Sequence, residues 1–171
     1  YTQTDTTGAR VNGVNYHSHI FGNEYFTSYF THPNKDRQSV LDLLRCNQPR
    51  RYLLNEKTFE VYAYLKVPKK VLKTLKPLIG QPLFDQATLA TRLKSLLDDE
   101  DYDRQKDKLL EGAYLSAYYS ETEVLPLYIL IADDAPQYRL LSPLLSLCWV
   151  HIGRHFKKLN PTIEHHKKLL N

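Results

Sequence analysis

A chain of 171 residues in which 42% are hydrophobic and 25% are charged has the composition of one globular domain with a substantial core. No apolar run approaches the roughly 18–20 residues of a membrane-spanning helix, so we expect no membrane partner. The net charge of +4 permits a polyanionic partner without requiring one. Because the chain starts at Tyr1 and contains no methionine, we expect it to be a piece of a longer protein.

The first thirty residues have the pattern of β-strands. They are rich in Val, Tyr, Phe, Ile and Thr, and residues 25–31 alternate with a period of two. Gly8 and Gly13 suit a first connection, and Gly22–Glu24 suits a second. The pattern therefore predicts three strands joined by tight turns, an antiparallel meander. In this interpretation Asp5 follows the first strand.

The period then changes to that of an amphipathic helix. Val40, Leu41 and Leu44 fall on one face of a helix that has Asn34 as its cap. Residues 49–120 are mostly helical in pattern, and we interpret them as a helical insertion. The predicted helices are Asn55–Leu65, Lys69–Ile79, Asp85–Leu97 and Arg104–Tyr119.

An unbroken apolar run, Leu127–Ala132, follows the helical block and ends at the acidic pair Asp133 and Asp134. Such a run predicts a strand buried on both faces. Asp134 is available to cap the helix that we expect next. The remaining predicted elements are a helix over 135–147, a short strand over 147–151, a basic helix from about 152 to 159 and a further helix that starts at Pro161.

The order of elements is three strands, a helix, the helical insertion, and then strands alternating with helices. This order predicts an α/β fold with a mixed sheet and is that of an RNase H-like core, in which the first and fourth strands lie side by side. We therefore expect residues 1–48 to form the first half of the core, 49–120 the helical insertion, and 121–171 the second half.

Asp5 and Asp133 are the candidate catalytic and metal-binding residues, because neighbouring strands would bring their carboxylates together. Two close carboxylates repel each other, and a divalent cation relieves that repulsion. A pair of Mg²⁺ or Mn²⁺ ions roughly 4 Å apart would support phosphoryl transfer with water or a DNA 3′-hydroxyl as the attacking group. From spacing alone, an Asp that caps a turn is the more common alternative.

Three sequence blocks resemble those of the DDE-class transposases of bacterial insertion sequences. At Asp5, DTTGAR resembles their D-[DE]-T-G-x-R motif, and a G-x-N…G-N-E hairpin and a K-x-R helix start follow it. LPLYILIADDAPQYRLL, residues 125–141, resembles the block of their second Asp. LCWVHIGRHFKKLNP, residues 147–161, resembles their C-W-x-H-x-x-R block. A helical insertion before the fourth strand occurs in one branch of that family.

The resemblance implies a catalytic core for DNA transposition, a form of DNA recombination, by metal-dependent strand cleavage and strand transfer. It carries over Asp5 as the first carboxylate, although Thr6 stands where the family usually has a second acid. We prefer Asp133 as the second carboxylate and assign Asp134 to capping or to a supporting role. The third acid is a Glu in an N-N-x-x-E motif that is missing here. The surroundings of Glu164 do not match it, so we expect that Glu downstream and expect this piece by itself to be inactive in strand transfer.

The resemblance also implies the partners: transposon ends and target DNA, and other copies of the full-length chain, in the bacterial cytoplasm at the nucleoid. Arg154, Lys157 and Lys158 follow the second-Asp block and are candidate contacts to the DNA backbone. A solvated helix face is the plainer interpretation of these charges. The alternative function is a non-catalytic DNA- or protein-binding domain on the same scaffold.

Cys148 and His151 have the spacing of half a zinc site, but the only other cysteine, Cys46, is far away in the sequence. A buried Cys148 and Trp149 that anchor the end of a strand are the plainer interpretation. We expect both cysteines to be reduced thiols. A C-x-x-H pair recurs after the second Asp in several transposase groups, which implies that it shapes the core near the active site.

Overall fold

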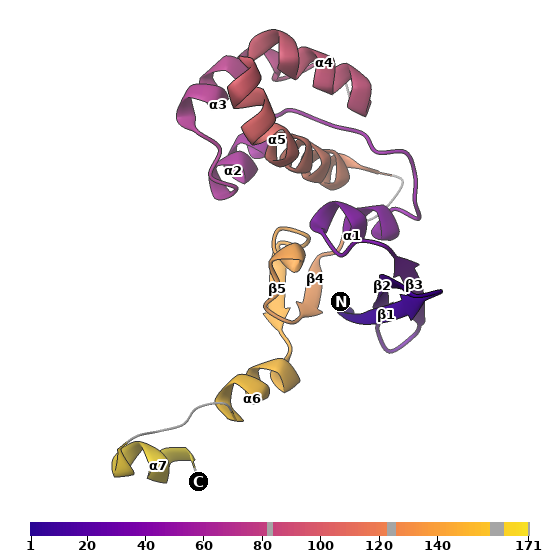
Figure 1. Ribbon diagram of the computed structural model, residues 1–171, viewed down its shortest axis with the longest axis vertical. Coiled ribbons are helices and arrows are strands. Elements are labelled where there is room, and N and C mark those ends of the chain that lie inside the picture. Colours follow the sequence, from indigo (N-terminus) through magenta and orange to yellow (C-terminus); the bar gives the residue numbers. More distant parts are fainter. Residues whose placement is uncertain (82–83, 123–125, 158–162, 171) are drawn as a thin grey trace.

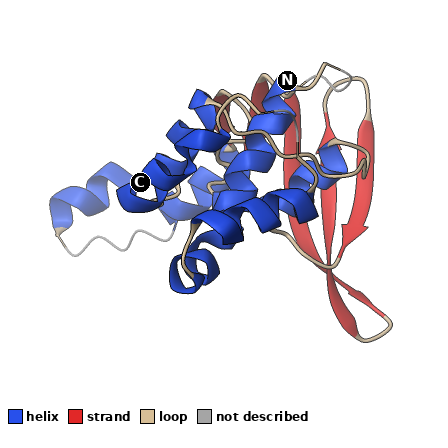
Figure 2. Cartoon of the chain, turned by 90° about the horizontal axis from the view of Figure 1, so that it is seen from above, coloured by secondary structure: helices blue, strands red, loops and turns tan. Residues whose placement is uncertain are grey.

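A five-stranded sheet lies at the centre of the computed structural model, which describes residues 1–81, 84–122, 126–157 and 163–170. Its strands are β1 (Thr2–Val11), β2 (Val14–Gly22), β3 (Thr27–His32), β4 (Ile129–Ala132) and β5 (Leu144–Leu147), in the order β3-β2-β1-β4-β5. The first three strands are antiparallel, whereas β4 pairs parallel with both β1 and β5. The predicted α/β class, the meander and the neighbouring first and fourth strands are thus confirmed (Figures 1 and 2).

The β1–β2 hairpin turns at Asn12 and Gly13, whose φ values are positive: 49° for Asn12 and 80° for Gly13. Asn-Gly is the preferred pair for such a two-residue hairpin turn. The prediction that Gly8 belongs to this connection is wrong, because Gly8 pairs with His17 inside the strand. Since β1 is longer than predicted, Asp5 lies within the strand and not after it.

Helix α1 (Arg37–Leu44) follows the meander and is capped by Asp36 instead of the predicted Asn34. The Asp36 carboxylate accepts a hydrogen bond from the Ser39 backbone N–H at 3.0 Å, which is the usual geometry of a cap. The backbone carbonyl of Asn34 is used elsewhere, because it lies 3.2 Å from Nε2 of His19.

The segment between α1 and β4 is helical, as predicted, and Figure 1 shows its helices grouped at one end of the molecule. It contains α2 (Glu56–Tyr64), α3 (Lys69–Leu75), the 3-10 helix η1 (Lys76–Leu78), α4 (Gln86–Leu96) and α5 (Asp99–Ser120). The start of α5 is five residues earlier than predicted. Its cap at Asp98 and an acidic first turn stabilise this early start through the helix dipole. The domain boundaries 1–48, 49–120 and 121–171 stay a prediction.

One hydrophobic core joins the helical segment to the sheet. Leu41 of α1, Tyr114 and Tyr118 of α5 and Leu130 of β4 are all buried in the same cluster. Side chains of α5 therefore hold the sheet and the helices together. None of the helices in the described part of the chain is long and apolar enough to cross a membrane.

Three predictions after the helical segment are wrong. In β4, Leu130 is buried but Ile131 is only half-buried, so the strand is not enclosed on both faces. Residues 135–147 form no long helix but the 3-10 helix η2 (Pro136–Tyr138) and then β5, because Pro143 cannot continue a helical hydrogen-bond ladder. Residues 149–151 are not a strand but the first residues of α6 (Trp149–Lys157), which begins earlier than the predicted 152.

The last described element is α7 (Glu164–Leu170). Its predicted start at Pro161 lies outside the described residues.

Candidate metal centre

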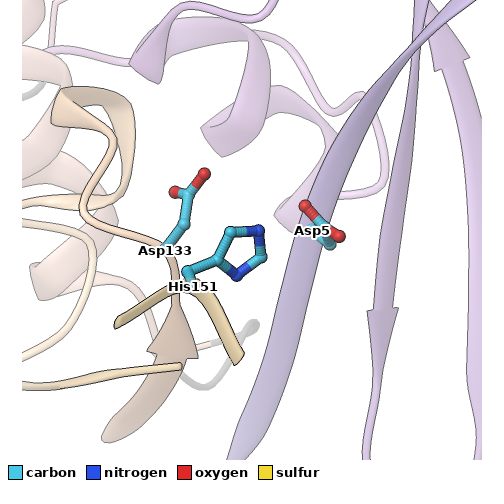
Figure 3. Close-up of side chains that lie close together, drawn as sticks. All are labelled: Asp5, Asp133 and His151. Atoms are coloured by element: carbon cyan, nitrogen blue, oxygen red, sulfur yellow. The ribbon is translucent and has the colours of Figure 1, made fainter. Parts of the chain in front are cut away.

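Asp5, Asp133 and His151 come together at one edge of the sheet. Asp5 lies on β1, Asp133 directly follows β4, and His151 lies in the first turn of α6. Their metal-ligand atoms all lie within 4.8 Å of one another. Figure 3 shows the imidazole between the two carboxylates. Among the described residues this is the one group of three or more His, Cys, Asp or Glu side chains close enough to hold a metal ion.

The two carboxylates meet because of the register of β1 and β4. Gln3 pairs with Ile131 in the parallel ladder. Residues two positions farther along each chain return to the same face of the sheet, and those residues are Asp5 and Asp133. The structure therefore brings together the two acids that the sequence singled out.

Backbone groups orient both carboxylates. Oδ1 of Asp5 accepts a hydrogen bond from the N–H of Thr6 at 2.8 Å, and Oδ1 of Asp133 accepts one from the N–H of Ala135 at 3.0 Å. Asp134 is exposed and is not part of the cluster. Its predicted capping role is wrong, because η2 has no side-chain cap.

His151 was not predicted to join the two carboxylates. It reaches the cluster because β5 lies parallel beside β4, so that the chain leaves both strands at the same edge of the sheet. Its Nδ1 atom is buried and has no hydrogen-bond partner in the part of the chain that the structure describes. Only the Cys-x-x-His spacing marked this residue in the sequence, and it pointed to a zinc site instead.

A cavity of about 440 Å³ opens beside the cluster. Asp5, His151 and Cys148 lie on its wall together with Ile131 and Glu24. The cavity therefore gives a ligand access to Asp5 and His151 from the direction of the turn between β2 and β3.

The Cys148 thiol lies next to His151, and a hydrogen bond to that imidazole lowers the pKa of the thiol. Trp149 has 84% of its surface exposed, so the interpretation of this residue as a buried anchor is wrong. Cys148 is half-buried and unpaired with Cys46, and both are free thiols.

Comparison with models of protein families, with curated proteins and with solved structures found no match to this chain. The resemblance to transposases therefore rests on the three sequence blocks, and the candidate site rests on its geometry.

A chain of hydrogen bonds supports β1 on the face opposite to Asp5. Thr6 Oγ1 lies 2.6 Å from the hydroxyl of Tyr138 and 3.0 Å from Nδ1 of His19. Nε2 of His19 donates to the carbonyl of Asn34, so Nδ1 is the acceptor from Thr6 in the neutral imidazole. Burial lowers the pKa of His19, which favours this neutral form. Thr6 thus has a structural role in this chain.

Arg37 holds the segment that follows Asp133. Its side chain is 8% exposed, and its guanidinium donates to the backbone carbonyls of Arg139 at 2.6 Å and Pro136 at 2.5 Å. It also forms an ion pair with Glu111 of α5. Sequence reasoning missed this residue, because none of its three partners is near it in the chain.

The remaining predicted residues lie outside the cluster. Arg154 is exposed on α6, Lys157 is the last residue of that helix, and Lys158 lies outside the described residues. Glu164 pairs with Lys167 at 2.7 Å and does not approach the two Asp residues. Contact of the basic residues with DNA stays a prediction.

Proposed function

We propose that this chain is the catalytic core of a DDE-class transposase, which cleaves DNA strands and transfers the resulting ends to a target. The observation that carries the proposal is the convergence of Asp5 and Asp133, whose ligand atoms lie within 4.8 Å although the helical segment separates them in the sequence. The resemblance implies these two residues as the first and second carboxylates.

The fold supports an RNase H-like core. The meander comes first, β4 lies parallel beside β1 at the centre of the sheet, and β5 follows β4. The helices α2 to α5 stand before the fourth strand, where one branch of the family has its insertion. The half-buried Cys148 and His151 line the cavity at the candidate site, as the resemblance implies for the C-x-x-H pair.

Asp5 and Asp133 would hold divalent cations, for which the residues present are suitable. Each carboxylate is fixed by one backbone hydrogen bond, and the imidazole of His151 lies beside them. Mg²⁺ or Mn²⁺ bound there would supply Lewis-acid activation of an attacking oxygen and stabilisation of a leaving one.

The reaction forms and breaks one phosphorus–oxygen bond in each step. In cleavage, a water oxygen bonds to phosphorus, the bond to the 3′ oxygen breaks, and that oxygen takes up a proton to become a 3′-hydroxyl. In strand transfer, this hydroxyl bonds to a target phosphorus while the target's own 3′ oxygen leaves and is protonated. No side chain becomes covalently attached, so the carboxylates act by position and charge.

DNA is the proposed partner, and the exposed Arg154 on α6 is a candidate contact to its backbone together with Lys157 and Lys158. Such contacts add salt-dependent affinity and no sequence recognition. The same proposal includes the assembly of several copies of the full-length chain into an oligomer.

Two measurements test the proposal: binding of Mn²⁺ to this chain, and nicking of supercoiled plasmid DNA in Mn²⁺ by a longer protein that includes the expected downstream Glu. We expect Asp5→Asn and Asp133→Asn to lose both activities and Asp134→Asn, the matched control next in the chain, to keep them. Nicking by Asp5→Asn at the wild-type rate would contradict the proposed site.

The second candidate is a non-catalytic binding domain on the same scaffold. It is favoured by the surface of α6, where Trp149 is 84% and Phe156 58% exposed near the basic Arg154. Stable DNA binding without nicking, unchanged in Asp5→Asn, would support this candidate over the enzyme.

A further inference from the structure

His151 offers the one nitrogen in a cluster whose other ligand atoms are carboxylate oxygens. We propose that His151 is a direct ligand of the cation at Asp5 and Asp133, and that the site therefore selects Mn²⁺ or another transition-metal ion over Mg²⁺. The inference rests on the cation site of the proposed function and is independent of the reaction with DNA.

The distances suit a single ion. Ligand atoms about 2.1 Å from a common cation lie at most about 4.2 Å apart. The three ligand atoms here lie within 4.8 Å of one another. Side-chain rotations that move these atoms by less than about 1 Å would therefore bring all three within bonding distance of one ion. Because the three residues come from β1, the end of β4 and α6, the folded chain fixes all three positions at once.

The environment of His151 gives a second, independent reason. Its Nδ1 atom is buried and has no hydrogen-bond partner among the described residues. A buried polar atom without a partner is rare in native structures, and a bound ion is one of its ordinary explanations. One of the two ring nitrogens lies in the cluster with the carboxylates, so a cation there would bind the imidazole together with both acids.

Cys148 does not compete as a fourth ligand. Its thiol lies near His151, but its sulfur is not part of the group whose ligand atoms lie within 4.8 Å. The donor set is therefore two oxygens and one nitrogen, which differs from the cysteine-rich sets of structural zinc sites.

This donor set determines the selectivity. Mg²⁺ prefers oxygen ligands and keeps several waters, whereas imidazole nitrogen suits transition-metal ions. In the usual order of affinities among divalent transition-metal ions, Zn²⁺ binds such a site more tightly than Mn²⁺ does. We expect Mn²⁺ to bind at least about tenfold more tightly than Mg²⁺, which a carboxylate-only site would not require.

Pulsed EPR of Mn²⁺ bound to the complete chain tests the proposal directly. A bound imidazole nitrogen gives a ¹⁴N modulation of the Mn²⁺ echo, and we expect it in the wild type. His151→Gln should abolish this signal and lower the affinity for Mn²⁺ by about tenfold or more. Even residues that only orient a metal ligand change metal affinity by ~10–100-fold. His155 is exposed one turn farther along α6 and lines a small pocket together with Asp133 and His151, so His155→Gln tests whether the other nearby imidazole is the ligand and should keep both the signal and the Mn²⁺ affinity.

His151→Asp is a second variant that replaces the nitrogen by an oxygen. It should still bind Mn²⁺ without the ¹⁴N modulation and should lose most of the preference over Mg²⁺. Circular dichroism of each variant establishes that a lost signal does not come from unfolding.

The outcomes separate this inference from the proposed function. Wild-type protein without ¹⁴N modulation, or His151→Gln with unchanged Mn²⁺ affinity, overturns ligation by His151, while loss of binding in Asp5→Asn still supports the carboxylate pair. Unchanged binding in Asp5→Asn removes the cation site and both proposals. A ¹⁴N signal in the wild type together with DNA nicking that is unchanged in Asp5→Asn supports the ligand set and contradicts the proposed enzyme.

Discussion

Arg37 of α1 and Glu111 of α5 form an ion pair between the sheet-side helix and the helical segment. The same guanidinium binds two backbone carbonyls of the segment that follows Asp133. One buried side chain thus links the helices to the loop that carries the second carboxylate.

Replacing Arg37 by Met should destabilise the fold and disturb the site. Glu111 would be left without its partner in a largely buried position, and breaking such a pair typically costs about 3–5 kcal/mol. Urea unfolding measures the loss, and Mn²⁺ affinity should fall in the protein that remains folded. The pair of Arg104 with Glu100 is mostly exposed, so Arg104→Ala should change the free energy of unfolding by less than about 0.5 kcal/mol. Equal effects of the two changes would contradict the role of Arg37.

His19 should make stability depend on pH. The imidazole is fully buried, and burial lowers its pKa below the ordinary value. The folded state therefore favours the neutral form. The stability that this provides is present above the unfolded pKa near 6.5 and is lost as the pH falls through about 6.5 toward the lowered folded value. Between pH 7.5 and 5.5 we expect a loss of up to about 1.4 kcal/mol by urea unfolding. His19→Gln should remove this dependence, and His155→Gln on the surface should keep it.

Two glycines of the β1–β2 hairpin should respond in opposite ways to alanine. Gly13 has a φ of 80°, so Gly13→Ala should destabilise by about 1–2 kcal/mol through backbone strain. Gly8 lies in β1 with an ordinary φ and no atom within 4 Å of an added Cβ. Gly8→Ala should therefore be neutral or stabilise by about 0.5–1 kcal/mol. Thermal unfolding of both variants checks the difference, and equal losses would be inconsistent with the turn at Asn12 and Gly13.

Two helix glycines give a similar test of packing. A Cβ at Gly112 of α5 would lie 2.5 Å from the ring of Tyr62 on α2, so Gly112→Ala should cost about 1–3 kcal/mol despite the better helix propensity of alanine. An added Cβ at Gly153 of α6 meets nothing within 4 Å, so Gly153→Ala should stabilise by up to about 1 kcal/mol. Stabilisation by Gly112→Ala in urea unfolding would mean that α2 and α5 do not pack this closely.

Asp133→Asn should reverse the order of stabilities with and without a cation. In a chelator the variant should be more stable than wild type by up to about 1 kcal/mol, because the repulsion between Asp133 and Asp5 is removed. Mn²⁺ at 100 times its Kd should stabilise wild type by about 2.7 kcal/mol and leave the variant unchanged. Equal stabilisation of both proteins, measured by urea unfolding, would place the cation elsewhere.

The local signals of the sequence predicted the meander and most helices well. Alternation over residues 25–31, a glycine at position 13 of the first connection and a helix that starts near Asn55 are short-range features. In the structure Asn55 caps that helix and forms a capping box with Thr58. The length of β1 was missed because its buried positions include Thr2 and Thr4 in place of apolar residues. Without an apolar alternation, the pattern does not show a strand around Asp5.

The site itself was predictable only in part. An acid that follows an apolar strand is a local signal, and it identified Asp133. The contribution of His151 depends on β5, whose pairing with β4 is set by contacts that span the chain. Leu144–Leu147 has a leucine spacing that also suits a helix, so the pattern predicted a helix where the structure has β5. As a result His151 was assigned to a strand and not to the first turn of α6.

During synthesis, β1 leaves the ribosome long before β4, because the whole segment from α2 to α5 lies between them. A growing chain carries Asp5 alone and gains Asp133 and His151 only when the sheet closes. The three candidate ligands therefore come together only after the whole helical segment has been synthesised, and a chain that stops before Asp133 has no such cluster.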